Sequence, residues 1–135
     1  MFSVMGTINR FEDLEIWKNA RVLCKDIRKL ILKNESFYRD FSLKDQISGS
    51  SGSIMDNIAE GFGREGNKEF INFLTFSQGS CNETKSQLYR AYDFEYISED
   101  ELTQLFDSIE KLANGIKALI NYLKSSNYKG TKFKR

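Results

Sequence analysis

The most distinctive part of this sequence is Ser50–Arg64, which reads SSGSIMDNIAEGFGR. Apolar residues recur at helical spacing within it and just before it, at Ile47, Ile54 and Ile58, and this spacing predicts the second half of an amphipathic helix. The helix is predicted to end near Glu60, because several glycines follow it at short intervals. The rest of the chain is arranged around this element.

A line of polar residues runs beside that apolar stripe when the helix is wound at 100° per residue. Buried amides and carboxylates need hydrogen-bond partners, because leaving them unpaired in an apolar environment is costly. We therefore predict a buried structural network that fixes the register of the helices and is joined by two residues of the next helix along the chain. Its predicted members are Gln46, Ser53, Asn57, Glu60, Ser80 and Glu83.

The same region has a second interpretation, as a metal site. Asp56, Glu60 and Glu83 would then supply oxygen donors to a magnesium ion. An all-α nucleotide pyrophosphohydrolase would need paired Glu-x-x-Glu and Glu-x-x-Asp motifs that face each other, and only Glu12-x-x-Glu15 approximates one. We favour the structural network and predict neither a metal ion nor a cofactor, because satisfied polar groups outnumber functional ones.

Several motifs of this chain occur together in one known family. They are the run Ser53–Arg64, Phe11-x-x-Leu14-x-x-Trp17, Leu43-x-x-Gln46, Glu69-Phe70-x-x-Phe73-Leu74 and Gly79-Ser80-x-x-Glu83. The chain thereby resembles the 23S rRNA-intervening-sequence protein family of bacterial four-helix-bundle proteins, over roughly residues 11–123. The resemblance implies a four-helix bundle and a cyclic homo-oligomer, a pentamer. It implies no established activity.

Composition limits the class of protein further. A chain of 135 residues is long enough for one domain with a core, and the absence of proline favours long uninterrupted helices. No run approaches the roughly 18 apolar residues that span a membrane, and the N-terminus lacks the layout of a signal peptide. We therefore expect a cytoplasmic protein without a membrane partner. Cys24 and Cys81 fall at apolar helical positions and are expected to be reduced core thiols.

Histidine is absent from the sequence. Its absence removes the commonest general base, the usual partner of a nucleophilic serine or cysteine, and the commonest zinc and iron ligand. The glycine-bearing link at residues 61–66 follows no strand and lacks Gly-Lys-Ser/Thr, so we interpret it as structural rather than as a phosphate loop. We predict that the protein is not an enzyme, and a metal-dependent nucleotide-processing enzyme is the weakest alternative.

Four segments carry a 3.6-residue apolar period, and each has a capping residue near its start. With no strand pattern, they predict an all-α, antiparallel up-down-up-down four-helix bundle, a single domain at residues 11–125. Residues 1–10 are expected to form a flexible lead-in, and residues 126–135 a basic C-terminal tail. The predicted helices are Asp13–Asn34, Ser42–Glu60, Asn67–Tyr92 and Ser98–Ser125.

The net charge of +1 conceals an asymmetry. The segment Lys124–Arg135 carries five basic residues and no acid, so the rest of the chain carries −4. The first helix also has a basic face opposite its apolar one, formed by Lys18, Arg21, Lys25, Arg28 and Lys29. This face is interpreted either as a solvated surface or as a nucleic-acid-binding surface.

The third helix has more apolar surface than one bundle can cover. Ile71 and Tyr89 lie to one side of its inward seam, and Phe76 lies to the other. A helix that is apolar on more than one face is normally buried on more than one face, and the monomer has only three other helices. We predict that these three residues contact a second copy of the chain.

Three function classes follow from these observations. The first is a non-catalytic oligomeric scaffold or adaptor whose partner, apart from the chain itself, is unidentified. The second is a ring that binds RNA or DNA through the basic face of the first helix, with the basic tail adding to it. The third is the enzyme already described as weakest. A shift of labelled RNA or DNA at physiological salt would discriminate the second class from the first.

Overall fold

Four amphipathic segments set the architecture of the structure, a computed structural model that describes residues 8–126. Each segment is one long helix, and within the described range all regular secondary structure is helical. A short 3₁₀ turn, η1 (Phe11–Asp13), precedes them, and a one-turn helix, α3 (Glu35–Arg39), separates the first two. The long helices are α2 (Glu15–Lys33), α4 (Phe41–Phe62), α5 (Asn67–Asp93) and α6 (Glu99–Ser125).

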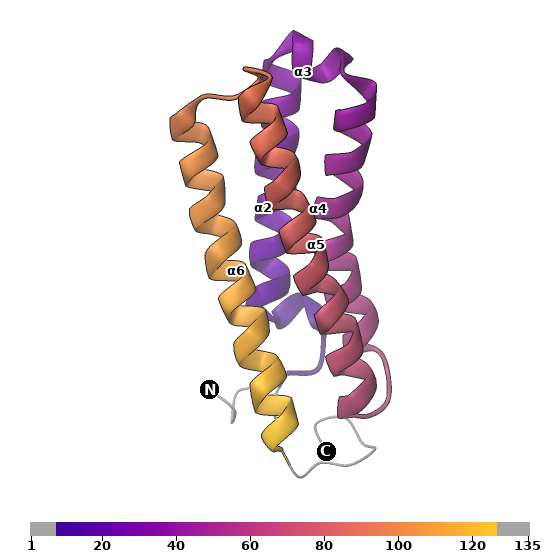
Figure 1. Cartoon of the computed structure of the whole chain (residues 1–135). Coiled ribbons are helices and arrows are strands. Elements are labelled where there is room, and N and C mark those ends of the chain that lie inside the picture. Colours follow the sequence, from indigo (N-terminus) through magenta and orange to yellow (C-terminus); the bar gives the residue numbers. More distant parts are fainter. Residues whose placement is uncertain (1–7, 127–135) are drawn as a thin grey trace.

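The long helices form a bundle in which successive members run in opposite directions (Figure 1). Helix α3 and the link from α5 to α6 lie at one end, and the link from α4 to α5 lies at the other. Each long helix packs against two others, in the pairs α2–α4, α4–α5, α5–α6 and α2–α6. The predicted all-α four-helix bundle is confirmed.

Side-chain caps explain where two of the helices begin. The Oδ1 atom of Asp40 accepts a hydrogen bond from the backbone N–H of Leu43 at 3.1 Å, so α4 begins at Phe41, one residue before the predicted start at Ser42. Ser98 forms a capping box at the start of α6: its Oγ accepts from the N–H of Glu101, and the Glu101 carboxylate accepts from the N–H of Ser98. Both caps satisfy backbone donors that have no partner within the helix.

The segment between the first two long helices contains the short helix α3. The Asn34 side chain caps α3 by accepting from the N–H of Phe37 at 2.9 Å. Phe37 is completely buried and stacks on Tyr96, with ring centroids 5.1 Å apart. The periodic signal misses this element because five residues are too few to show a period.

The ends of the described range bear on two predictions. Ile8, within the predicted lead-in, packs against the core together with Phe11. Residues 1–7 of that lead-in and residues 127–135 of the basic tail lie outside the described residues. No helix among residues 8–126 is long and apolar enough to cross a membrane.

The buried apolar side chains form one cluster along the axis of the bundle. Cys81 belongs to this core, and burial raises the pKa of its thiol to about 11. Cys24 is half-buried at the α2–α4 seam, where its Sγ donates to the carbonyl oxygen of Ser51 at 3.2 Å. Burial also raises the pKa of the Cys24 thiol. Neither cysteine forms a disulfide.

Candidate functional site

A polar network does lie between α4 and α5, but in a different place from the predicted one. The Oγ of Ser50 donates to Oε1 of Gln87 at 2.5 Å and lies 2.9 Å from Oγ1 of Thr84. Oγ1 of Thr84 donates in turn to the carbonyl oxygen of Ser80 at 2.8 Å. Ser50, Thr84 and Gln87 are all buried, so these bonds join the two helices inside the core.

Small hydroxyl side chains continue along the same seam. Ser77 is completely buried, and its Oγ crosses the seam to donate to the carbonyl oxygen of Ile54 at 2.9 Å. Ser51, whose carbonyl oxygen accepts from Cys24 of α2, donates to the carbonyl oxygen of Ile47 at 2.7 Å within α4 and does not cross this seam. Because these residues are short, the two helices approach closely while every hydroxyl among them keeps a partner.

The six residues of the predicted network do not act as one group. Ser53, Asn57 and Ser80 come together at the edge of the seam, where the Oγ of Ser53 accepts from Nδ2 of Asn57 at 2.9 Å and from Ser80 at 3.0 Å. Their hydrogen bonds stay within the α4–α5 contact. These three residues of the predicted line therefore join α4 to α5, although Ser53 and Asn57 are half-buried rather than fully buried.

The prediction of burial is wrong for Gln46, Glu60 and Glu83, which are exposed. Gln46 contacts Ser42 and accepts from the Arg90 guanidinium, and Glu60 pairs with Arg64 at 2.7 Å. The polar line follows the rim of the seam. Long side chains at the rim reach solvent, whereas serine and asparagine are too short to do so.

The metal interpretation receives no geometric support. Asp56, Glu60 and Glu83 are all exposed, and no group of three histidine, cysteine or acidic side chains suited to a metal ion occurs within residues 8–126. The arrangement on α4 and α5 offers hydrogen bonds between helices rather than a cage of oxygen ligands.

Sequence reasoning missed Ser50 and Gln87 as network members. A usable signal existed, since Ser50 lies one helical turn from Ile47 and from Ile54 and therefore falls within the apolar stripe of α4. A polar residue at such a position is buried and must find a partner. The partner itself could not be predicted, because periodicity does not say which turn of α5 faces it.

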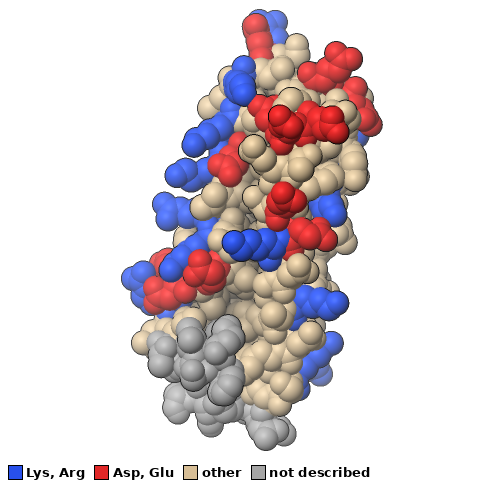
Figure 2. Space-filling model, turned by 90° about the vertical axis from the view of Figure 1, so that its left-hand side faces the viewer, with Lys and Arg blue, Asp and Glu red and all other residues tan. Residues whose placement is uncertain are grey.

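The basic face of α2 is exposed to solvent. Figure 2 shows lysine and arginine side chains following one another down the left-hand edge of the molecule, where the turned view places α2. Among residues 8–126, none of the five cations takes part in an ion pair between side chains. The five exposed residues are Lys18, Arg21, Lys25, Arg28 and Lys29.

The apolar residues predicted to contact a second copy occupy two flanks of α5. Phe76 is 58% exposed on the side that packs on α4 and meets Phe73 edge to face, with centroids 5.8 Å apart. Tyr89 is 52% exposed on the α6 side and meets Phe106 edge to face, with ring centroids 4.8 Å apart. Ile71 is half-buried and packs against the core of its own chain.

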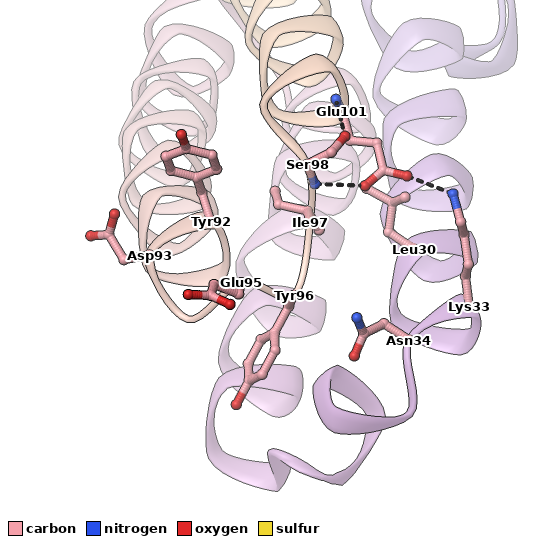
Figure 3. Close-up of a pocket in the computed structure, with 10 residues that line it drawn as sticks. All are labelled: Leu30, Lys33, Asn34, Tyr92, Asp93, Glu95, Tyr96, Ile97, Ser98 and Glu101. Carbon is pink, nitrogen blue, oxygen red and sulfur yellow. Dashed lines mark hydrogen bonds and ion pairs between the residues drawn. The ribbon is translucent and has the colours of Figure 1, made fainter.

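A cleft of about 760 Å³ lies at the end of the bundle where α5 turns into α6. Figure 3 shows Leu30 and Lys33 of α2, with Asn34 just after it, on one side of the cleft, and the end of α5 with the link to Ser98 on the other. Lys33 pairs with Glu101 at 2.6 Å, and this hydrogen bond lowers the pKa of the Glu101 carboxyl, helped by the N–H of Ser98.

Tyr96 forms part of the same cleft and ties it to the start of α4. Its hydroxyl donates to Oδ2 of Asp40 at 2.8 Å, and this bond to a carboxylate raises the pKa of the hydroxyl above its ordinary value. Because the same Asp40 caps α4 through its other oxygen, one carboxylate connects the link from α5 to α6 with the start of α4.

Fold and surfaces together define a small all-α bundle protein with a hydroxyl-lined α4–α5 seam. The chain belongs to the 23S rRNA-intervening sequence protein family, whose sequence model matches residues 12–118. The family resemblance drawn from the motifs is confirmed. A comparison with curated proteins finds no match.

A solved structure shares the fold. It is the crystal structure of a protein with unknown function from the S23 ribosomal protein family of Bacteroides thetaiotaomicron VPI-5482. The two superpose with a TM-score of 0.70 at 20% sequence identity, over 78% of this chain and 97% of the other. At this identity the likeness shows the fold alone, and neither comparison names an enzyme.

Proposed function

We propose that this protein is a non-catalytic scaffold that assembles with copies of itself through the two flanks of α5. The observation that carries the proposal is the pair of exposed aromatic side chains, Phe76 and Tyr89, on opposite flanks of one helix. Exposed aromatic residues are the usual anchors of protein interfaces. Each is braced by a second ring of its own chain, so little side-chain freedom would be lost on contact.

Two different flanks favour a ring over a two-fold dimer. In a two-fold dimer the same patch of both subunits meets, whereas a ring joins one patch to a different patch of the next copy. The flanks marked by Phe76 and Tyr89 are 13 residues apart, which corresponds to about 140° around the helix. One copy would therefore bring its Phe76 flank to the Tyr89 flank of its neighbour. The family resemblance adds the expectation of five subunits.

Complementary variants test this arrangement. Phe76→Glu and Tyr89→Glu each damage one flank, so we expect each variant alone to sediment as a monomer at tens of micromolar. Mixed at equal amounts, they should form a one-to-one complex. The Tyr89→Glu chain keeps its Phe76 flank and the Phe76→Glu chain keeps its Tyr89 flank, so one intact contact can form between them. Phe41→Glu is the matched control, since Phe41 is 62% exposed on α4, away from both flanks, and it should assemble like the parent.

Two results would contradict the scaffold proposal. Single variants that assemble like the parent would show that the flanks are not the interface. A Tyr89→Glu variant that forms stable dimers by itself would indicate a two-fold contact through the Phe76 flank instead of a ring. Circular dichroism on each variant separates loss of assembly from loss of fold.

A second candidate function, binding of RNA or DNA, is favoured by the exposed cations of α2. Because no described carboxylate pairs with them, they are available to phosphate groups. Repetition of the face around a ring would raise the effective concentration of each contact. Such binding would be sensitive to salt and poor in sequence preference, since no described element resembles a groove-reading module.

Charge reversal on α2 tests this candidate. Lys25→Glu with Arg28→Glu should weaken binding of a labelled RNA or DNA by at least about tenfold at about 100 mM salt. Lys111→Glu with Lys117→Glu makes the same charge change at exposed positions of α6 and should have a much smaller effect. Equal losses in both variants would mean that net charge, rather than this face, governs binding.

A further inference from the structure

The cleft at the α5–α6 end is lined by more acid than base. Its single lysine, Lys33, is already paired with Glu101. Asp93 and Glu95 also line it, and neither takes part in an ion pair among the described residues. In Figure 2 acidic side chains gather at this end of the molecule. The cleft is therefore suited to a positively charged occupant.

Aromatic and apolar side chains give the cleft a surface for more than a point charge. Tyr92 and Tyr96 line one wall, and Figure 3 shows Ile97 and Leu30 between that wall and Lys33. Tyrosine rings attract ammonium and guanidinium groups over their faces, and the apolar floor accommodates the aliphatic stem of a lysine or arginine. A basic segment of polypeptide matches both properties.

Glu95 is held in this cleft in an unfavourable backbone conformation. Its φ is 64°, and among residues 8–126 no other residue except glycine has a positive φ. The link closes on it by hydrogen bonds from the N–H of Tyr96 to the carbonyl oxygen of Ala91 at 2.8 Å and from Phe94 to Arg90 at 2.9 Å. Glycine is the residue usually found at this position of a helix end. Glu95 at this position therefore lowers the stability of the fold relative to glycine.

The chain itself contains a segment with the required chemistry. Residues 127–135 read NYKGTKFKR, with four cations, two aromatic rings and no acid. The four cations are Lys129, Lys132, Lys134 and Arg135. Lysine and arginine side chains interspersed with Tyr128 and Phe133 match a cleft that offers both carboxylates and tyrosine rings.

Length disfavours docking of this segment in the cleft of its own chain. Helix α6 has 27 residues, so its two ends are about 40 Å apart at about 1.5 Å per residue. Ser126 follows its last turn, whereas the cleft surrounds its first. Even fully extended, the backbone from Ser126 to Lys134 spans only about 28 Å. The cleft of another copy needs no such complete extension of the segment, so it is the favoured site.

We propose that the basic segment Lys129–Arg135 of one copy docks in the cleft lined by Asp93, Glu95 and Tyr92 of a second copy. The contact is electrostatic and aromatic, and it uses neither Phe76 nor Tyr89, although Tyr92 and Asp93 lie one helical turn beyond Tyr89 on α5. A variant that lacks both Phe76 and Tyr89 therefore separates this contact from the ring interface. Since it joins opposite ends of two bundles, it links copies end to end.

Zero-length cross-linking on an isotopic mixture tests the contact. Full-length chains labelled with ¹⁴N and ¹⁵N are mixed in equal amounts and treated with a carbodiimide, which joins a lysine amine to a carboxylate it touches. We expect mixed-isotope peptide pairs between Lys129, Lys132 or Lys134 and Asp93 or Glu95. Their yield should fall steeply from about 50 mM to about 500 mM salt, because exposed charges are screened.

Variants separate docking from folding. Asp93→Asn with Glu95→Gln removes two carboxylates from the cleft and leaves Glu101 as the third. The yield of cross-links between the lysines of the segment and Glu101 should therefore fall about tenfold. Glu95→Gly should raise the denaturant midpoint, because glycine suits the positive φ, while it lowers the yield on Asp93. Asp107→Asn, an exposed carboxylate elsewhere on α6, should leave the yields at their parent level.

Several outcomes would overturn the proposal. One is the absence of tail-to-cleft cross-links, and another is cross-links that occur only within single-isotope chains. A third is lysines of residues 129–134 that react equally with Asp107 and with the cleft, which indicates contact by charge alone. A fourth is loss of the cross-links when nucleic acid is added at one phosphate group per tail, which would show that the segment prefers phosphate to the cleft. Cross-links that persist in Phe76→Glu with Tyr89→Glu would support the docking even if the α5 interface fails.

Discussion

Gly61 and Gly79 both lie within long helices, yet their surroundings differ. A Cβ at Gly61 would lie 2.7 Å from Cβ of Phe73 and 2.9 Å from Cδ1 of Phe70, on the facing helix α5. A Cβ at Gly79 would meet nothing within 4 Å. The first glycine allows α4 and α5 to approach, and the second only lowers helix propensity.

Alanine substitutions should therefore have opposite effects at these two positions. We expect Gly61→Ala to destabilise the fold by about 1–3 kcal/mol, because the core must shift to admit a methyl group. Gly79→Ala should stabilise it by about 0.5–1 kcal/mol through helix propensity. Urea unfolding of both variants measures the difference, and equal effects would show that the close approach at Gly61 is not a constraint.

The hydroxyl network gives a second prediction at this scale. Ser50→Ala leaves the buried oxygen of Gln87 without its donor, so we expect a loss of about 1–3 kcal/mol in the free energy of unfolding. Glu60→Ala removes an exposed pair with Arg64 and should cost no more than about 0.5 kcal/mol. If Glu60→Ala proved the more harmful of the two, the line first predicted from the sequence would have to be reinstated.

At the scale of single elements, the capping box of α6 couples the stability of the bundle to acid. Hydrogen bonds from Lys33 and from the backbone of Ser98 lower the pKa of Glu101 below its ordinary value of 4.5. A carboxyl whose pKa is lower in the folded state stabilises the fold fully above its unfolded pKa. That contribution is lost as the pH falls through the folded pKa.

Glu101→Gln should therefore reduce the loss of stability between about pH 6 and pH 3. Glutamine still accepts the N–H of Ser98, so the cap itself is retained and only the charged contribution disappears. Asp107→Asn, on the same helix but without an ion pair among the described residues, should follow the parent curve more closely. Unfolding free energies across this pH range provide the comparison, and parallel curves for parent and Glu101→Gln would contradict the assignment.

The elements also show what sequence alone could predict. The four long helices were predictable to within about two residues at each end, because their apolar periods are long; of their starts, that of α6 also has a recognisable capping box. Periodicity gives the angle of a residue around its own helix. It does not give the height at which a neighbouring helix covers it, so Ser53 and Glu60 shared one predicted line but differ in burial. The cleft was not predicted for a similar reason, since its walls come from α2 and from a link about 60 residues further on.

For the molecule as a whole, the missing histidines make stability insensitive to pH near neutrality. No side chain of the type that ordinarily titrates between about pH 6 and 8 is present, and the pKa values of both thiols are raised. Native thiols hold their protons more tightly than unfolded ones, so their contribution is complete below the ordinary pKa of 9.0. It is lost as the pH rises towards about 11, the pKa of Cys81.

We therefore expect a flat free energy of unfolding from about pH 6 to pH 8 and a decline above about pH 9. The measurement is urea unfolding of protein without a histidine tag, with Cys81→Ala as a comparison. That variant should be less stable throughout but should decline less between about pH 9 and pH 10.5. A change of more than about 1 kcal/mol between pH 6 and 8 would contradict the prediction, because a change of that size requires a side chain whose pKa falls in this range.

The order in which the helices pack also bears on how the chain reaches its fold. Three of the four seams, α2–α4, α4–α5 and α5–α6, join helices that follow one another along the chain, and only α2–α6 joins its two ends. Contacts between near neighbours close short loops, which is the feature that makes helical bundles fold in microseconds to milliseconds. The seam between α2 and α6 has to close the longest loop, so it would be the last to form and the first to open.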